Sequence, residues 1–97
     1  MTPQRRLQLK RISLVRALKA ARGCLVCGTK NPAVLDFEHR DPAAKDPRLR
    51  RNNRHSSGVG WIGLSFANIR AEAEKCDVMC SNHHRIRQAW QRRMAVI

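Results

Sequence analysis

Cysteine and histidine pairs supply the most specific chemistry in this 97-residue sequence. Cys24 and Cys27 are separated by two residues, and Cys80 and His83 repeat that spacing far downstream. A Cys-x-x-Cys pair followed by a Cys-x-x-His pair is typical of a closed, tetrahedral structural zinc site. The sequence therefore predicts that these four residues bind one Zn²⁺, which would supplement the small hydrophobic core of so short a chain.

Other interpretations of the cysteines remain open. Cys76 could replace His83 as the fourth ligand, or it could be a small buried residue without a metal. The segment Cys24–Cys27 could also be a thioredoxin-like redox motif, but the chain lacks the alternating strands and helices of that fold. Gly23 and Gly28 flank the segment and permit the sharp turn by which two thiolates converge on one ion. This turn favours zinc.

A second candidate site begins at the end of a short alternating segment, Val34 to His39. The alternation predicts a strand with Leu35 and Phe37 on one face, and with Asp36 and Glu38 on the other. His39 stands at the end of this strand. Because a strand end is a rigid support, Glu38 and His39 are candidate catalytic or metal-binding residues.

His84 is the third candidate, directly after the zinc ligand His83 on a helix predicted from about Asn82 to Met94, with Ser81 as its cap. Adjacent helical residues point about 100° apart. The face predicted to pack on the core contains His83, Ile86, Trp90, Met94 and Ile97. His84 should then face the polar surface and meet Glu38 and His39 beside this helix, away from the zinc, at a site open to solvent.

Two further helices should position these groups. The first begins at Thr2-Pro3 and stops at Gly23, and its apolar stripe contains Leu7, Leu14, Val15, Leu18 and Ala21, with Lys19 among the basic residues outside it. The second runs from about Phe66 to Lys75 with Ser65 as its cap, and its inward residues are Phe66, Ile69 and Ala73. Cys76 to Met79 should be extended.

Residues 41–64 contain mainly loop signals, with a short strand or helical turn expected near Lys45 to Arg51. His55 in this stretch is interpreted as exposed and without a role. Trp61 and Ile62 are expected to fold the loop back onto the core.

The charge indicates a polyanionic partner. Twenty Lys and Arg against seven Asp and Glu give a formal net charge of +13. The basic residues concentrate in residues 1–23, 40–54 and 85–97, which favours nucleic acid first and an anionic membrane second. No apolar window approaches the length of a membrane span and no signal sequence is recognisable, so the expected location is a reducing cytoplasm.

Taken together, the motifs resemble the HNH endonucleases, and in particular the small, stand-alone, zinc-bound HNH proteins of phages and bacteria. The resemblance covers about residues 23–87 and rests on three segments, Cys24-x-x-Cys27-Gly28, Leu35-Asp36-Phe37-Glu38-His39 and Glu72-x-x-Lys75-Cys76-Asp77-Val78-x-Cys80-x-Asn82-His83-His84-Arg85. It implies an α+β fold with a treble-clef ββα-metal unit. A single domain would span 1–97, with a basic N-terminal helix in 1–22, the zinc and ββα-metal core in 23–87, and the end of the C-terminal helix in 88–97.

The resemblance also implies catalytic roles. His39 would be the general base, while Glu38, where the family usually has Asp, and His84 would bind a catalytic Mg²⁺ or Mn²⁺; nickel or zinc would also be accepted in vitro. The middle Asn of the family, which orients the base, has two candidate positions here. Counting back from Cys80 gives Lys75, whereas Asn82 has the matching residue type.

The function implied is hydrolysis of DNA phosphodiester bonds in a bacterial or phage-infected cell, either alone or beside a larger phage packaging or replication machine. Seven arginines would contact the phosphate backbone: Arg5, Arg6, Arg40, Arg85, Arg87, Arg92 and Arg93. The alternative is a zinc-stabilised nucleic-acid-binding module without catalysis. That alternative explains the charge and the zinc ligands but leaves Glu38, His39 and His84 without a role.

Overall fold

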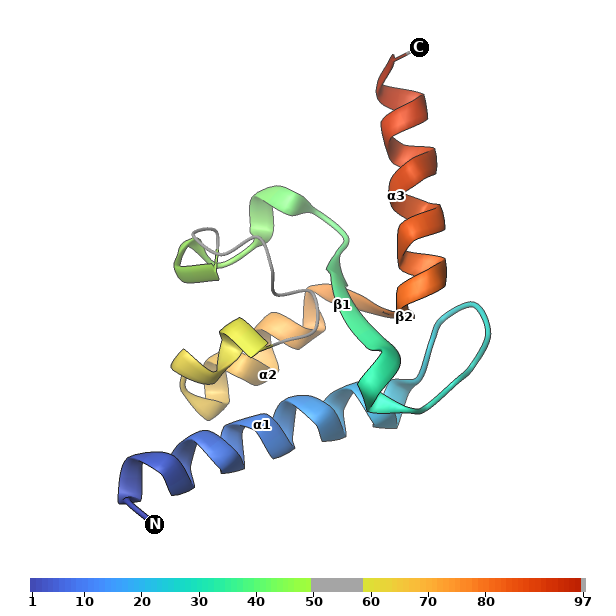
Figure 1. The fold of residues 1–97 in the computed structure, drawn as a ribbon. Helices are drawn as coiled ribbons and strands as arrows, with labels where there is room; N and C mark the ends of the chain where they lie inside the picture. Colours follow the sequence, from blue (N-terminus) through green and yellow to red (C-terminus); the bar gives the residue numbers. More distant parts are fainter. Residues whose placement is uncertain (50–58, 97) are drawn as a thin grey trace.

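The computed structural model describes residues 1–49 and 59–96 (Figure 1). The helices are α1 (Pro3–Arg22), α2 (Phe66–Glu74) and α3 (Ser81–Val96), and the strands are β1 (Leu35–His39) and β2 (Cys76–Cys80). Short 3₁₀ turns lie at Pro32–Val34, Pro42–Ala44, Pro47–Leu49 and Val59–Gly63. The predicted α+β class with an N-terminal helix is confirmed. His55, Ile97 and most of the predicted element at Lys45 to Arg51 lie outside the described residues.

The two strands form an antiparallel sheet, in which Leu35 pairs with Cys80 and His39 pairs with Cys76. Because side chains alternate across a strand, Leu35 and Phe37 point into the core, where each is at most 2 % exposed. The sheet thus brings a predicted zinc ligand at the end of β2 beside the start of β1. The polar residues of β1 are left on the opposite face, where α3 packs.

Helix α1 has the predicted ends. The Thr2 hydroxyl accepts a hydrogen bond from the Arg5 N–H, and Gly23 ends the helix with φ of 70°, a conformation that favours glycine. Its apolar stripe is narrower than predicted, since Val15 is buried while Leu7 is 38 % exposed.

The predicted basic face of α1 is wrong at Lys19, which is buried. Its side chain is 4 % exposed, and its ammonium group donates to the Leu35 carbonyl at 3.0 Å. The long aliphatic stem of a lysine can cross an apolar layer while its charged end reaches a polar atom. Lys19 therefore connects α1 to the start of β1 and belongs to the interior.

The core lies between α1, α2 and the sheet. The Trp61 ring stacks on Phe37 with ring centroids 4.3 Å apart and is 1 % exposed, so this residue belongs to the core, as predicted. On α2, Ile69 and Ala73 are buried as predicted. Phe66, at the first turn of α2, is 39 % exposed instead, and Arg11 Cζ lies over its ring, 5.9 Å from the ring centroid.

Helix α3 differs most from the sequence prediction. Ile86, Trp90 and Met94 are 53 %, 58 % and 69 % exposed, whereas His84 is 7 % exposed. Figure 1 shows why: α3 lies against the sheet at its beginning and then extends away from the rest of the chain. The predicted core-facing stripe is therefore wrong, and His84, not the apolar stripe, faces the body of the protein. Within the described ranges, no helix is long and apolar enough to cross a membrane.

Candidate functional site

Cys24, Cys27, Cys80 and His83 come together in one cluster that could bind a metal. Their ligand atoms all lie within 4.8 Å of one another. The Cys27 and Cys80 sulfurs are 3.9 Å apart, and Cys24 Sγ lies 3.8 Å from His83 Nδ1. Two thiolates bound tetrahedrally to zinc at about 2.3 Å are separated by about 3.8 Å. The cluster is thus consistent with a bound zinc.

The local backbone prepares Cys24 to be a ligand. The N–H groups of Val26 and Cys27 lie 3.4 and 3.5 Å from its sulfur. Burial acts to raise the pKa of Cys24, but hydrogen bonds from backbone N–H groups, with Cys27 first, lower it to about 6. The thiolate, which is the form that binds metal, is therefore available near neutral pH. The turn is held to the sheet by the Leu25 N–H, which donates to the Val78 carbonyl at 2.9 Å.

Cys76 lies outside this cluster. Its side chain is fully buried, its thiol donates to the Glu72 carbonyl at 3.4 Å, and burial raises its pKa to about 12. A thiol held neutral in this way is a poor metal ligand. Of the two interpretations of Cys76, the structure supports the small buried residue.

A separate cavity of about 740 Å³ lies between the polar face of β1 and the first turns of α3. Glu38, His39 and His84 all line it, so the structure brings the three candidate catalytic residues to one place. Phe37, Leu49 and Trp61 form apolar parts of its wall. Asn82 is exposed on α3 and is not among the described residues that line the cavity.

Asp36 fixes the orientation of His84. Its Oδ2 lies 3.1 Å from His84 Nδ1, and this hydrogen bond raises the pKa of His84, with burial opposing it. Because a carboxylate accepts at Nδ1, that nitrogen carries the proton, and Nε2 holds the lone pair of the neutral ring. Nε2 lies 3.9 Å from Glu38 Oε2. Sequence reasoning missed this role of Asp36, although its place two residues before Glu38 on one strand face was a usable signal.

Glu38 has the property expected of a cation ligand. Its Oε2 is buried and has no hydrogen-bond partner among the described residues. Burying a carboxylate oxygen without a partner is costly unless a positive charge is near. The Arg87 guanidinium lies 3.6 Å away, and the Gln88 amide lies 3.2 Å from His84 Nε2. Both contacts would have to break before Glu38 and His84 could bind the same cation.

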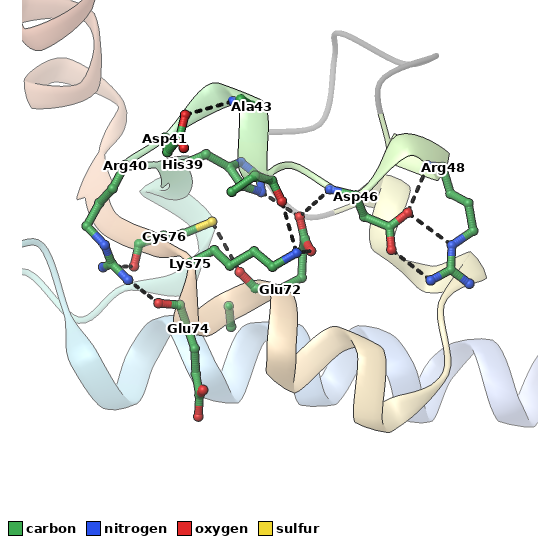
Figure 2. Close-up of polar contacts among 12 residues, drawn as sticks. His39, Arg40, Asp41, Ala43, Asp46, Arg48, Glu72, Glu74, Lys75 and Cys76 are labelled. Atoms are coloured by element: carbon green, nitrogen blue, oxygen red, sulfur yellow. Dashed lines mark hydrogen bonds and ion pairs between the residues drawn. The ribbon is translucent and has the colours of Figure 1, made fainter.

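His39 makes its closest polar contact with a residue that the sequence did not assign. Figure 2 shows its ring directed at Glu72 on α2, with Nε2 and Oε2 2.7 Å apart. Glu72 is 2 % exposed and also accepts hydrogen bonds from the Asp46 N–H and from Lys75. Its position three residues after Ile69, on the inward face of α2, was the signal that sequence reasoning could have used. Lys75 thus lies near His39 but contacts Glu72.

The predicted DNA-contacting arginines divide into two groups. Arg40 and Arg87 make ion pairs with Asp77 at 3.1 and 2.9 Å, and Arg40 also donates to the carbonyls of Cys76 and Glu74 (Figure 2). The Arg40 side chain is still 49 % exposed and lines the cavity. The other five are also exposed: Arg5, Arg6, Arg85, Arg92 and Arg93. Arg85 lines the cavity together with Lys45, which sequence reasoning did not single out.

The structure does not gather all the exposed arginines on one surface. The N-terminal end of α1, with Arg5 and Arg6, and the far end of α3, with Arg92 and Arg93, lie at opposite ends of a molecule 51 Å long (Figure 1). Arg85 lies between them, at the cavity.

Comparisons with protein-family models, curated proteins and solved structures found no match to this chain. A functional assignment therefore has to come from the chemistry of the two clusters. One is a compact set of soft ligands, and the other is a cavity with carboxylates, imidazoles and nearby cationic side chains.

Proposed function

We propose that this chain is a metal-dependent endonuclease of the HNH type that hydrolyses DNA phosphodiester bonds. The observation that carries the proposal is Glu38 Oε2, a buried oxygen without a hydrogen bond among the described residues, 3.9 Å from His84 Nε2 in the cavity that His39 also lines. A buried carboxylate oxygen and an imidazole nitrogen at this distance would suit a divalent cation once Arg87 and Gln88 release them, and a second imidazole lining the same cavity suits proton transfer.

The scaffold would be a zinc-bound treble clef. Cys24 and Cys27 lie in a turn before the sheet, and Cys80 and His83 lie where β2 passes into α3. A zinc bound by all four residues would hold the start of α3 against the sheet. Because His84 is adjacent to His83, the same zinc would keep His84 at the cavity.

Hydrolysis requires water to add to phosphorus while the bond to one bridging oxygen breaks. His39 is proposed to accept a proton from the attacking water at Nδ1. Its Nε2 faces the Glu72 carboxylate and already carries the N–H proton of the neutral ring. Glu38 and His84 would hold a Mg²⁺ or Mn²⁺ ion, which when bound supplies positive charge to the phosphate and the leaving oxygen. Asp36 would keep the His84 lone pair directed at that position.

Binding of the DNA backbone would come from cationic side chains at and beyond the cavity. Arg85 and Lys45 line it and are suited to contact the phosphates next to the cleaved bond. Exposed Arg92 and Arg93 on α3 would extend the contact along the duplex. These contacts do not read base edges, so the proposed binding depends little on sequence.

The test is cleavage of supercoiled plasmid by purified protein with Mg²⁺, with Mn²⁺ or with chelator. Wild type should cleave only with a divalent ion, and His39→Ala should lower the rate by roughly 10²–10⁴-fold while keeping its zinc content and its DNA affinity. Trp90→Ala, at an exposed position outside the cavity lining, is the control and should cleave at the wild-type rate. Equal cleavage by His39→Ala would refute the proposal.

The second candidate is a zinc-stabilised nucleic-acid-binding module without catalysis. It is favoured by the contacts of Arg87 with Glu38 and of Gln88 with His84, since both proposed ion ligands already have protein partners. If wild type binds DNA and cleaves none with any divalent ion tested, this function replaces the nuclease.

A further inference from the structure

We propose that Glu72 positions the imidazole of His39, so that one ring nitrogen is held as a donor to protein and the other is presented as the proton acceptor. The inference rests on the proposed nuclease function, because it concerns how His39 acts as a base. Glu72 lies on α2 and is not among the described residues that line the cavity, so it would act through His39 and not on the substrate.

The contact has the geometry of a strong, charge-assisted hydrogen bond. His39 Nε2 and Glu72 Oε2 are 2.7 Å apart, and the two side chains are 10 % and 2 % exposed. A carboxylate acts only as an acceptor, so Nε2 must carry a proton. Nδ1 is then the unprotonated nitrogen of the neutral ring, and His39 has a single tautomer suited to accept a proton.

Glu72 is itself held in place as an anion. Its Oε2 accepts from the Asp46 N–H at 3.0 Å, and its Oε1 accepts from Lys75 Nζ at 2.9 Å. Burial acts to raise the pKa of Glu72, but these donors and His39 lower it overall. With three donors on two oxygens, the carboxylate has little freedom to rotate away from His39.

The same carboxylate connects the catalytic histidine to the wall of the cavity. Lys75 Nζ bridges Glu72 and the Ala44 carbonyl, and Asp46 lies in the same segment that follows β1 (Figure 2). Lys45, which lies between Ala44 and Asp46 in the sequence, lines the cavity. Glu72 therefore fixes the orientation of His39 relative to the surface that would hold the phosphate.

The test compares Glu72→Gln with Glu74→Gln, in which the same change is made at an exposed position on the same helix. The amide introduced by Glu72→Gln can still accept from His39 but is neutral, so it no longer enforces one tautomer. We expect kcat to fall by about 10²-fold or more with little change in KM, since the corresponding loss of a histidine-orienting carboxylate in a serine protease costs about 10⁴-fold. Glu74→Gln should cleave at the wild-type rate.

A double-mutant cycle separates positioning from a general structural role. If Glu72 acts only through His39, then Glu72→Gln should cause no further loss of cleavage in a His39→Ala background. A similar loss in both backgrounds would overturn the inference and make Glu72 a purely structural residue.

A readout that needs no activity keeps this inference separate from the nuclease proposal. In ¹⁵N-labelled protein, His39 should appear as the Nε2–H tautomer, with a ring proton resonance that moves upfield in Glu72→Gln because an amide is a weaker acceptor than a carboxylate. An unchanged resonance would overturn the positioning role even if wild type cleaves DNA. Conversely, absence of cleavage by wild type refutes the nuclease, while the resonance still decides whether Glu72 orients His39.

Discussion

His84 Nδ1 lies 3.1 Å from Asp36 Oδ2, and this contact joins the first turn of α3 to the polar face of β1. The two side chains are 9 % and 16 % exposed, so water competes only weakly for the hydrogen bond. The contact leaves Nε2 of His84 on the side of Glu38. A carboxylate behind a ligating histidine commonly raises the basicity of that histidine and fixes its ring.

Asp36→Asn should weaken binding of the proposed Mg²⁺ or Mn²⁺ ion by about 10–100-fold, the usual effect of losing such an outer partner. Titration of Mn²⁺ into zinc-loaded protein, followed by calorimetry, measures this directly. Asp41→Asn is the matched control, because Asp41 caps the Ala43 N–H on an exposed turn and is not among the described residues that line the cavity. Equal Mn²⁺ affinity in the two variants would remove Asp36 from the proposed site.

The same pair predicts a pH dependence of stability. The hydrogen bond with Asp36 raises the pKa of His84 above its ordinary value of 6.5, despite the opposing effect of burial. The protonated ring is therefore favoured in the folded protein. Its contribution to the free energy of unfolding is fully present below pH 6.5 and is lost as pH rises through the raised pKa.

Urea unfolding of zinc-loaded protein, without Mg²⁺ or Mn²⁺, would check this across the range from mildly acidic to alkaline pH. The stability difference between wild type and His84→Gln should be largest at the acidic end and shrink as the pH rises. A difference that grows with pH would contradict the assignment, since it would require a lowered pKa. Taking differences between variants cancels the titration of the zinc ligands common to both.

Removal of the zinc site should unfold the protein. A structural zinc contributes on the order of 10–16 kcal/mol, about as much as the whole stability of a small domain. Cys24→Ser should therefore lose the metal and its cooperative melting transition. Cys76→Ala, which alters a cysteine outside the cluster, should lose some stability and keep one zinc per chain. Zinc analysis and circular dichroism of both variants would check this; loss of zinc from Cys76→Ala would restore that residue as a ligand.

The arginines should separate in their effect on DNA affinity. Each phosphate contact contributes about −0.9 to the slope of log affinity against log salt. Arg85→Ala should reduce the magnitude of that slope by about this amount, because Arg85 is exposed at the cavity. Arg40→Ala should leave the slope nearly unchanged and instead lower stability, because it breaks the contacts with Asp77, Cys76 and Glu74. Fluorescence anisotropy over a salt series measures both slopes. A larger change in slope for Arg40→Ala than for Arg85→Ala would show that the roles assigned to these two arginines are wrong.

Local signals predicted the parts of the fold that depend on local chemistry. Thr2 and Gly23 mark the two ends of α1, as predicted, because side-chain capping and a positive φ are properties of single residues. The strand alternation placed Leu35 in the core because one strand face had to be buried. The spacing of the cysteines and His83 indicated the metal cluster because the two members of each pair are only three positions apart in the sequence.

Tertiary contacts decided the features that were missed. Helical periodicity identified the stripe of Ile86, Trp90 and Met94, but it could not say that no element of the described chain covers the outer turns of α3. Charge suggested a solvent-exposed side chain for Lys19, although its ammonium group donates to the Leu35 carbonyl. The contact of Arg40 with the Cys76 carbonyl could likewise not be predicted from its charge. The link between His39 and Glu72 joins residues far apart in sequence and depends on how α2 packs.

The adjacency of His83 and His84 has a consequence for how this protein can be altered by evolution or by design. His83 belongs to the metal cluster and His84 lines the cavity. The first turn of α3 therefore fixes the directions in which both side chains point. Inserting or deleting one residue between Cys80 and His83 would rotate the following side chains by about 100° and misplace both histidines. Substitutions can change either site separately, but changes in chain length at this point cannot. The start of α3 should therefore tolerate no change in length, whereas a change in length at its C-terminal end would leave both histidines in place.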